Sequence, residues 1–127
     1  MQRKATPGER RNARQPGNHS IPALSESDLL SQVTQVAELL GWSWVHFRPA
    51  RTAHGWRTPV SGPLGKGFPD LVMMRPRDRR ILFVELKSAR GKASPEQERI
   101  AMLLDQMGLP YVLLNPSGFD AFVEVLR

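Results

Sequence analysis

Apolar residues in two stretches of the chain follow the spacing of a helix that packs on one side. In the first stretch, residues 24–42, they recur every three or four positions: Leu29, Leu30, Val33, Val36, Ala37 and Leu40. Ser25 followed by Asp28 forms a capping-box pattern at the start of this helix, and Gly41 ends it.

The second stretch begins at Ser94, with a proline at the first helical position and Gln97 as a capping-box partner. Its apolar residues are again helically spaced, and Gly108 follows them: Ile100, Ala101, Leu103, Leu104 and Met107. The last ten residues, 118–127, predict a short closing helix.

Four runs rich in branched and aromatic residues predict strands: 43–47, 68–74, 80–87 and 110–114. A short basic connection, RPRDR, joins the second run to the third and favours an antiparallel hairpin. The unit from the third run through the second helix to the fourth run predicts a right-handed parallel crossover. The predicted fold is therefore α/β, with a central mixed four-stranded sheet flanked by helices.

Two segments lack any such periodicity. Residues 1–22 hold five Lys or Arg and one acid, with almost nothing apolar, which predicts a disordered basic tail before a folded domain at 23–127. Residues 48–67 are rich in Gly, Pro and Arg and predict a long loop without strands or helices. A loop of that length is usually functional or disordered.

Charge and composition narrow the function classes. The 18 Lys and Arg against 12 Asp and Glu give a net charge of +6, and this surplus favours a polyanionic partner such as nucleic acid. The chain has no cysteine, so disulfides, thiolate nucleophiles and zinc fingers are excluded. No apolar run is long enough to span a bilayer, and we expect a soluble, cytoplasmic protein, in the host cytoplasm if it is phage-encoded.

The predicted hairpin carries three charged residues among apolar ones. Glu85 and Lys87 share one face of their strand, since alternate residues point the same way. Asp70 and Glu85 lie equally far from the hairpin tip, so they can face each other. Two carboxylates held so close repel each other unless a cation lies between them.

Oxygen ligands without cysteine point to a hard divalent ion, Mg²⁺ or Mn²⁺. Lys87 could then position a water molecule, act as a base, or stabilise charge on phosphorus, and the sequence does not choose among these roles. The alternative is an ordinary solvated ion pair between Glu85 and Lys87. The apolar character of both strands argues against that alternative.

Three motifs together resemble a known family: GFPD before one strand, VELK at the end of the next, and SPEQ at a helix start. They are similar to those of the PD-(D/E)XK nuclease superfamily, and in particular of its VRR-NUC branch, whose small members resemble Holliday-junction resolvases. The resemblance covers residues 25–127. It implies a restriction-endonuclease-like αβββαβα core and a metal-dependent phosphodiesterase that acts on DNA.

The resemblance also implies roles for single residues. Asp70 and Glu85 match metal ligands, the Leu86 carbonyl matches a backbone ligand, and Lys87 matches the catalytic lysine. Glu26 matches an acid on the first helix, with a direct or water-mediated metal role, although an acid is favoured in any first helical turn.

Two further positions carry alternatives. Gln97 matches the glutamine of the S-x-x-Q motif, which could bind the scissile phosphate or Lys87, and it also serves the capping box. His46 lies on the strand near the site, where we expect a histidine of the core or the rim.

The 48–67 loop is longer than the short loop of the compact members. Its basic and aromatic residues, and two cations after the VELK strand, are candidates for DNA binding: Arg48, Arg51, Trp56, Arg57, Lys66, Arg90 and Lys92. A mobile loop that only aids solubility is the alternative. The RPRDRR connection has the same two interpretations, as a DNA contact or as an ordinary hairpin tip.

These observations predict a Mg²⁺-dependent DNA endonuclease, with Mn²⁺ as a substitute, that prefers branched or otherwise structured DNA. A homodimer is expected if the substrate is a four-way junction, because such an enzyme needs two active sites. The rival hypotheses are a catalytically silent nucleic-acid-binding module with the same fold, and a small basic protein that coats nucleic acid.

Overall fold

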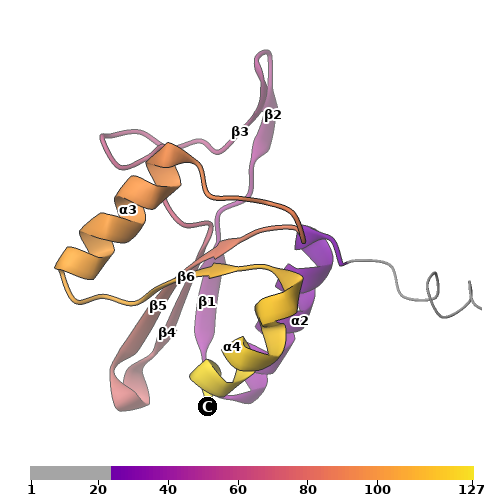
Figure 1. Cartoon of the computed structure of the whole chain (residues 1–127), viewed down its shortest axis with the longest axis vertical. Helices are drawn as coiled ribbons and strands as arrows, with labels where there is room; N and C mark the ends of the chain where they lie inside the picture. Colours follow the sequence, from indigo (N-terminus) through magenta and orange to yellow (C-terminus); the bar gives the residue numbers. More distant parts are fainter. Residues whose placement is uncertain (1–23) are drawn as a thin grey trace, which may run out of the picture.

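A mixed sheet of four strands forms the centre of the structure, a computed structural model that describes residues 24–127 (Figure 1). The strands lie in the order β1, β4, β5, β6, with these bounds: β1 Ser43–His46, β4 Leu71–Arg75, β5 Arg80–Leu86 and β6 Tyr111–Leu114. The β1–β4 and β4–β5 pairs are antiparallel and the β5–β6 pair is parallel. The predicted restriction-endonuclease-like core is confirmed, while the basic tail predicted for residues 1–22 lies outside the described residues.

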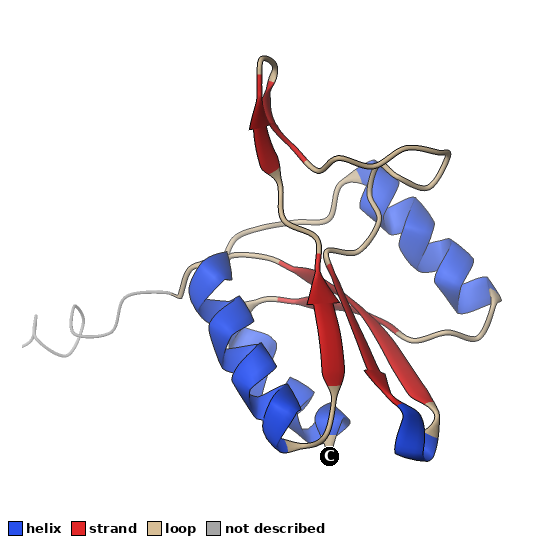
Figure 2. Cartoon of the chain, turned by 180° about the vertical axis from the view of Figure 1, so that it is seen from behind, coloured by secondary structure: helices blue, strands red, loops and turns tan. Residues whose placement is uncertain are grey.

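Within residues 24–127, three α-helices cover the sheet: α2 (Glu26–Leu39), α3 (Pro95–Gln106) and α4 (Phe119–Leu126). Figure 2 shows α2 and α4 on one face of the sheet and α3 on the other. Both predicted capping boxes form, at the starts of α2 and α3. None of the helices in residues 24–127 combines the length and the apolar character of a membrane span.

The main core lies between the sheet and the pair α2 and α4. The apolar stripe predicted for α2 faces this core, since Leu29, Val33 and Ala37 are fully buried. On the other face, α3 buries Ile100 and Leu104. The prediction that Met107 belongs to the packed α3 stripe was wrong: Met107 is the C-cap residue of α3, and 69% of its surface is exposed.

The prediction of an unstructured loop at 48–67 was also wrong in part. Strands β2 (Ala50–Thr52) and β3 (Gly55–Arg57) pair into a small antiparallel hairpin. The Thr52 hydroxyl accepts from the His54 N–H at 3.1 Å and donates to the Gly55 carbonyl at 2.7 Å, which closes the turn. Both strands are mostly exposed, so the sequence shows no alternation of apolar and polar residues that would have predicted them.

Strand β4 starts later than the sequence pattern suggested, at Leu71 instead of Phe68. Pro69 explains the delay, because proline has no N–H to donate to a neighbouring strand. The three residues 68–70 therefore form a separate connection into the sheet, and Asp70 stands at its last position.

At the other end of β4, the hairpin tip holds a buried arginine. Arg75, 3% exposed, donates to both carboxylate oxygens of Asp78 and to the carbonyls of Leu40 and Leu126, at 2.8–3.0 Å. Its guanidinium also lies over the Trp42 ring, 4.7 Å from the centroid. Arg75 therefore binds the C-terminal ends of α2 and α4 to the sheet, so this part of the RPRDRR connection is structural.

Candidate active site

A glycine allows the chain to reach the site. Gly67 has φ +90, a conformation that residues with a side chain rarely adopt. A Cβ at this position would also lie 2.6–2.7 Å from backbone and Cβ atoms of Glu96, near the start of α3. Gly67, the glycine of the GFPD motif, is therefore needed because the chain passes very close to the start of α3.

Three aromatic rings hold the next residues in place. Phe68 packs edge-to-face between Phe47 and Phe83, with ring centroids 6.1 Å apart in both pairs. Pro69 is fully buried, and the Phe47 N–H donates to the carbonyl of Asp70 at 2.8 Å. The backbone of Asp70 is thus fixed from both sides before β4 begins.

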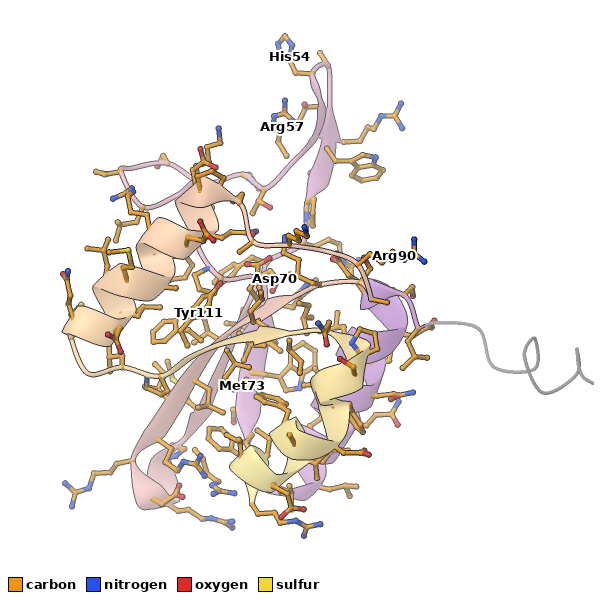
Figure 3. The ribbon with its side chains drawn as sticks, in the orientation of Figure 1. His54, Arg57, Asp70, Met73, Arg90 and Tyr111 are labelled. Atoms are coloured by element: carbon orange, nitrogen blue, oxygen red, sulfur yellow. The ribbon has the colours of Figure 1, made fainter. Side chains whose placement is uncertain are left out.

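The two acids of the motif meet at this end of the sheet. Leu71 pairs with Val84, and the same register continued by one residue sets Asp70 opposite Glu85, as the hairpin pattern predicted. One carboxylate oxygen of Asp70 accepts from the Leu86 N–H at 3.1 Å. Glu85 is 6% exposed, and its Oε1 atom is buried without a hydrogen-bond partner among the described residues. Figure 3 shows Asp70 close to the base of the β2–β3 hairpin.

Burial sets the electrostatics of this pair. It raises the pKa of Asp70 to about 6, with the Leu86 N–H opposing the shift and the charge of Glu26 adding to it. Burial and then the charge of Asp70 raise the pKa of Glu85 to about 8. Lys87 lowers the pKa of both carboxyls. At neutral pH the two groups therefore carry a full double charge only if a further cation compensates it.

The donor atoms suit a hard cation. Within the described residues, no three His, Cys, Asp or Glu side chains lie close enough together to hold a metal ion. The pair Asp70 and Glu85 offers carboxylate oxygens, and Leu86, whose carbonyl was expected as a backbone ligand, lines the same cleft. The unpartnered Oε1 of Glu85 is the observation that fits such an ion. Glu26 influences the pair through its charge, which raises the pKa of both carboxyls.

An open cleft of about 1150 Å³ surrounds these acids. Most residues that the sequence singled out line it: Glu26, Arg48, Trp56, Arg57, Lys66, Asp70, Glu85, Leu86 and Gln97. Arg51, Lys87, Arg90 and Lys92 are not among its lining residues. The cleft therefore combines acids at one point with cations and an indole around them.

Lys87 lies just beyond the cleft lining. Its N–H donates to the Leu114 carbonyl at 2.8 Å, which continues the β5–β6 pairing. A Cβ on Gly91 would lie 3.1–3.2 Å from the Cβ and Cδ atoms of Lys87, so the following loop packs closely over the stem of this side chain. Arg90 and Lys92, on the same loop, are exposed.

Gln97 has two contacts in the capping box and a place in the cleft. Its Oε1 atom accepts from the Ser94 N–H at 2.9 Å, and its own N–H donates to the Ser94 hydroxyl at 3.1 Å. The side-chain nitrogen keeps two donors for other partners. The structural role expected for Gln97 is thus present, and the residue lines the cleft as well.

Lys66, expected to contact DNA, and His46, expected in the core or at the rim, both line the cleft in different surroundings. Lys66 pairs with Glu96 at 3.6 Å, and the lysine side chain is 83% exposed. His46 is half-buried on β1 at the edge of the cleft. Burial and the nearby Arg48 lower the pKa of His46, while Glu26 raises it. His46 therefore matches the rim histidine expected from the sequence.

Sequence reasoning missed Tyr111. Its hydroxyl is the other buried side-chain oxygen without a partner in residues 24–127. Tyr111 pairs with Phe83 on the neighbouring strand, so it shares the sheet face of Glu85, two residues further along β5. Burial and the charges of Glu85 and Asp70 raise its pKa to about 12. The predicted parallel pairing of β5 with β6 was the signal that could have found it.

Most of the chain matches a protein-family model. The VRR-NUC domain model matches residues 22–117, three quarters of the chain, and this range contains all the acids and cations named above. No curated protein and no solved structure matches the chain. The GFPD, VELK and SPEQ motifs all fall within the matched range. The chain therefore belongs to the VRR-NUC domain family, whose domain is a nuclease of the PD-(D/E)XK type.

Proposed function

We propose that the protein is a divalent-metal-dependent DNA endonuclease that prefers branched or otherwise structured DNA. The observation that carries the proposal is the pair of a partly buried Asp70 and a buried Glu85, with one oxygen of Glu85 unpartnered among the described residues. A carboxylate held in this way gains most from a cation, because a buried polar atom without a partner costs about 1–3 kcal/mol.

Asp70, Glu85 and the Leu86 carbonyl would hold the ion, and Glu26 would take part through a water molecule. All these donors are oxygens, which suits Mg²⁺, with Mn²⁺ as a substitute. When bound, the ion would make a water molecule more acidic and neutralise charge on the phosphate.

The remaining groups act on the DNA directly. Water adds to phosphorus and gives up one proton, the bond from phosphorus to one deoxyribose oxygen breaks, and that oxygen takes up a proton. The Lys87 ammonium stabilises the charge on the phosphate oxygens. Gln97 donates from its amide nitrogen to a phosphate oxygen. Arg48 and Arg57 bind neighbouring phosphates and thereby fix the strand in the cleft.

The test is cleavage of plasmid and four-way-junction DNA in Mg²⁺, Mn²⁺ or EDTA. Asp70→Asn, Glu85→Gln and Lys87→Ala should each reduce cleavage at least about a hundredfold while DNA binding persists. Asp105→Asn is the matched control. Asp105 is an exposed acid at the far end of α3, and this variant should cleave DNA at the parent rate.

Three outcomes would contradict parts of the proposal. Cleavage that persists in all three variants would remove the site assignment. Binding without cleavage in either metal would favour the catalytically silent module. Equal cleavage of junction, flap and plain duplex at matched salt would remove the structure preference, and salt must be matched because phosphate contacts make affinity strongly salt-dependent.

A homodimer belongs to the same proposal, because a four-way junction is resolved by two cuts. Sedimentation of the protein alone and with junction DNA tests it. A single copy in both states would leave a nicking nuclease and remove the resolvase.

A further inference from the structure

The β2–β3 hairpin stands apart from the rest of the fold. Its two strands pair with each other and not with the main sheet. In Figures 1 and 2 it projects beyond the end of the sheet where Asp70 lies, and Figure 3 shows His54 at its tip. A two-stranded hairpin by itself is only marginally stable in water. Core packing therefore does not account for this element.

The hairpin presents an aromatic ring to solvent. Trp56 is 61% exposed, and the guanidinium of Arg51 on the opposite strand lies 5.7 Å from its ring centroid. Arg51 and Trp56 are direct partners in the register, so they occupy the same face of the hairpin. Together they form a flat surface of an indole and a cation.

The segment that contains this surface carries charges of one sign only. Residues 48–67 contain four Lys or Arg and no acid. Such a segment complements a polyanion, and an exposed indole adds a stacking platform for a base.

The hairpin is also continuous with the proposed active site. Trp56 and Arg57 line the same cleft as Asp70 and Glu85. A nucleotide whose phosphate lies at the two carboxylates therefore has neighbours within reach of the hairpin.

We propose that the β2–β3 hairpin is a base-stacking finger, in which Trp56, supported by Arg51, stacks on an unpaired or unstacked base close to the cleaved phosphate. This inference rests on the proposed function and names the element that sets its DNA preference. In a continuous duplex each base is paired and stacked on both sides, and exposing one costs a few kcal/mol. At a branch point, gap or strand end that cost is reduced, so the finger favours interrupted DNA.

Binding in EDTA tests the inference without cleavage. The probes are a duplex with a one-nucleotide gap and the matching continuous duplex, each carrying 2-aminopurine at the base beside the gap position. Wild-type protein should quench 2-aminopurine in the gapped probe through stacking. Trp56→Ala should weaken binding to the gapped probe about 5- to 150-fold, the range for loss of one base stack. It should change binding to the continuous duplex less than about twofold, and Trp56→Phe should keep most of the preference.

Two controls separate stacking from charge and from general damage. Arg57→Ala should weaken both probes equally and reduce the slope of log affinity against log salt by about 1. Trp44→Phe changes another exposed indole outside the cleft and should alter neither probe.

Equal weakening of both probes by Trp56→Ala, no weakening, or no quenching by the wild type would overturn the finger. Since the assay needs no metal, a finger that passes it in a protein that cleaves no DNA would remove the proposed function alone.

Discussion

The two ends of the β4–β5 hairpin both bury a charged side chain, and the surroundings of these charges differ. At the tip, Arg75 is 3% exposed and has carboxylate, carbonyl and ring partners in Asp78, Leu40, Leu126 and Trp42. At the opposite end, about 17 Å away along the strand, Glu85 is 6% exposed with an oxygen that none of the described residues contacts.

The difference separates a structural charge from a functional one. Every donor on Arg75 that contacts the chain replaces a bond to water, so its burial is compensated within the fold. Glu85 lacks such compensation, and its raised pKa reflects that deficit. A buried charge left incomplete by its own chain is a candidate for an external partner.

The largest expected effect is loss of the arginine partner network. Arg75→Met should lower the free energy of unfolding by about 3–5 kcal/mol, because Asp78 loses its ion-pair partner and the carbonyls of Leu40 and Leu126 each lose one of two donors. Urea denaturation measures the change, and Mg²⁺ should not alter it. Arg77→Met removes only an exposed contact of 3.3 Å to the Leu40 carbonyl and should stay within about 0.5 kcal/mol of the parent. A loss below 1 kcal/mol for Arg75→Met would refute the structural role.

The second-largest expected effect comes from a change at Gly67, three residues before Asp70. Gly67→Ala should destabilise the protein by about 1–3 kcal/mol, because it adds a clash with Glu96 to a strained φ. Cleavage should also fall about a hundredfold, since Asp70 is displaced.

Gly62→Ala is the matched control, because Gly62 has a similar φ of +94 with no atom within 4 Å of the added Cβ. The control isolates the backbone strain from the clash. Equal stability of the two variants would show that the close approach to Glu96 has no energetic consequence.

The buried, unpaired carboxyl of Glu85 should make the stability of the protein depend on pH. In EDTA, the folded pKa of Glu85 lies at about 8, above its unfolded value of 4.5, so the wild type loses stability as pH rises from about 5 to 8. Glu85→Gln does not titrate and should therefore be more stable than the wild type at pH 8.5, by about 1–3 kcal/mol, with little difference at pH 5. Melting temperatures across this range measure it.

Addition of Mg²⁺ at pH 8.5 should raise the melting temperature of the wild type and leave that of Glu85→Gln nearly unchanged. Glu98→Gln, an exposed acid on α3, should behave as the wild type in both respects. A pH-independent difference between Glu85→Gln and the wild type would count against the buried, uncompensated carboxyl.

The smallest effect concerns the two buried hydroxyls. Tyr111→Phe removes a hydroxyl without a partner and should leave stability equal or up to about 1 kcal/mol higher. Thr34→Val removes one that donates to the Leu30 carbonyl at 2.8 Å and should lower stability by about 1 kcal/mol. Urea denaturation of both variants makes the comparison, and a loss above 1 kcal/mol for Tyr111→Phe would mean that its hydroxyl has a partner in solution.

The sequence was sufficient for the elements whose residues alternate between core and solvent. The α2 stripe and the hairpin register followed from counting, and the same count set Asp70 opposite Glu85. Local signals of this kind depend on residues within a few positions of one another.

Contacts between distant segments and exposed elements could not be predicted in the same way. Arg75 reaches Leu126 across 51 positions, and nothing near Arg75 in the sequence marks that contact. The β2–β3 hairpin buries no apolar face, so its strands have no period. The separation of Glu26 from the acidic pair depends on how α2 packs on the sheet, which the helix pattern leaves undetermined.

The capping box of α3 places an unusual restriction on Gln97. For the start of a helix, glutamate serves as well as glutamine, because either side chain can accept from the N-cap N–H. A glutamate would, however, add a fourth acid to a cleft that Glu26, Asp70 and Glu85 already line and that is proposed to bind phosphate. Gln97→Glu should thus preserve the capping hydrogen bond of α3 and add negative charge to the cleft. Position 97 must therefore cap α3 and must also avoid repelling phosphate. Glutamine and glutamate both meet the first requirement, and of these two only glutamine meets both.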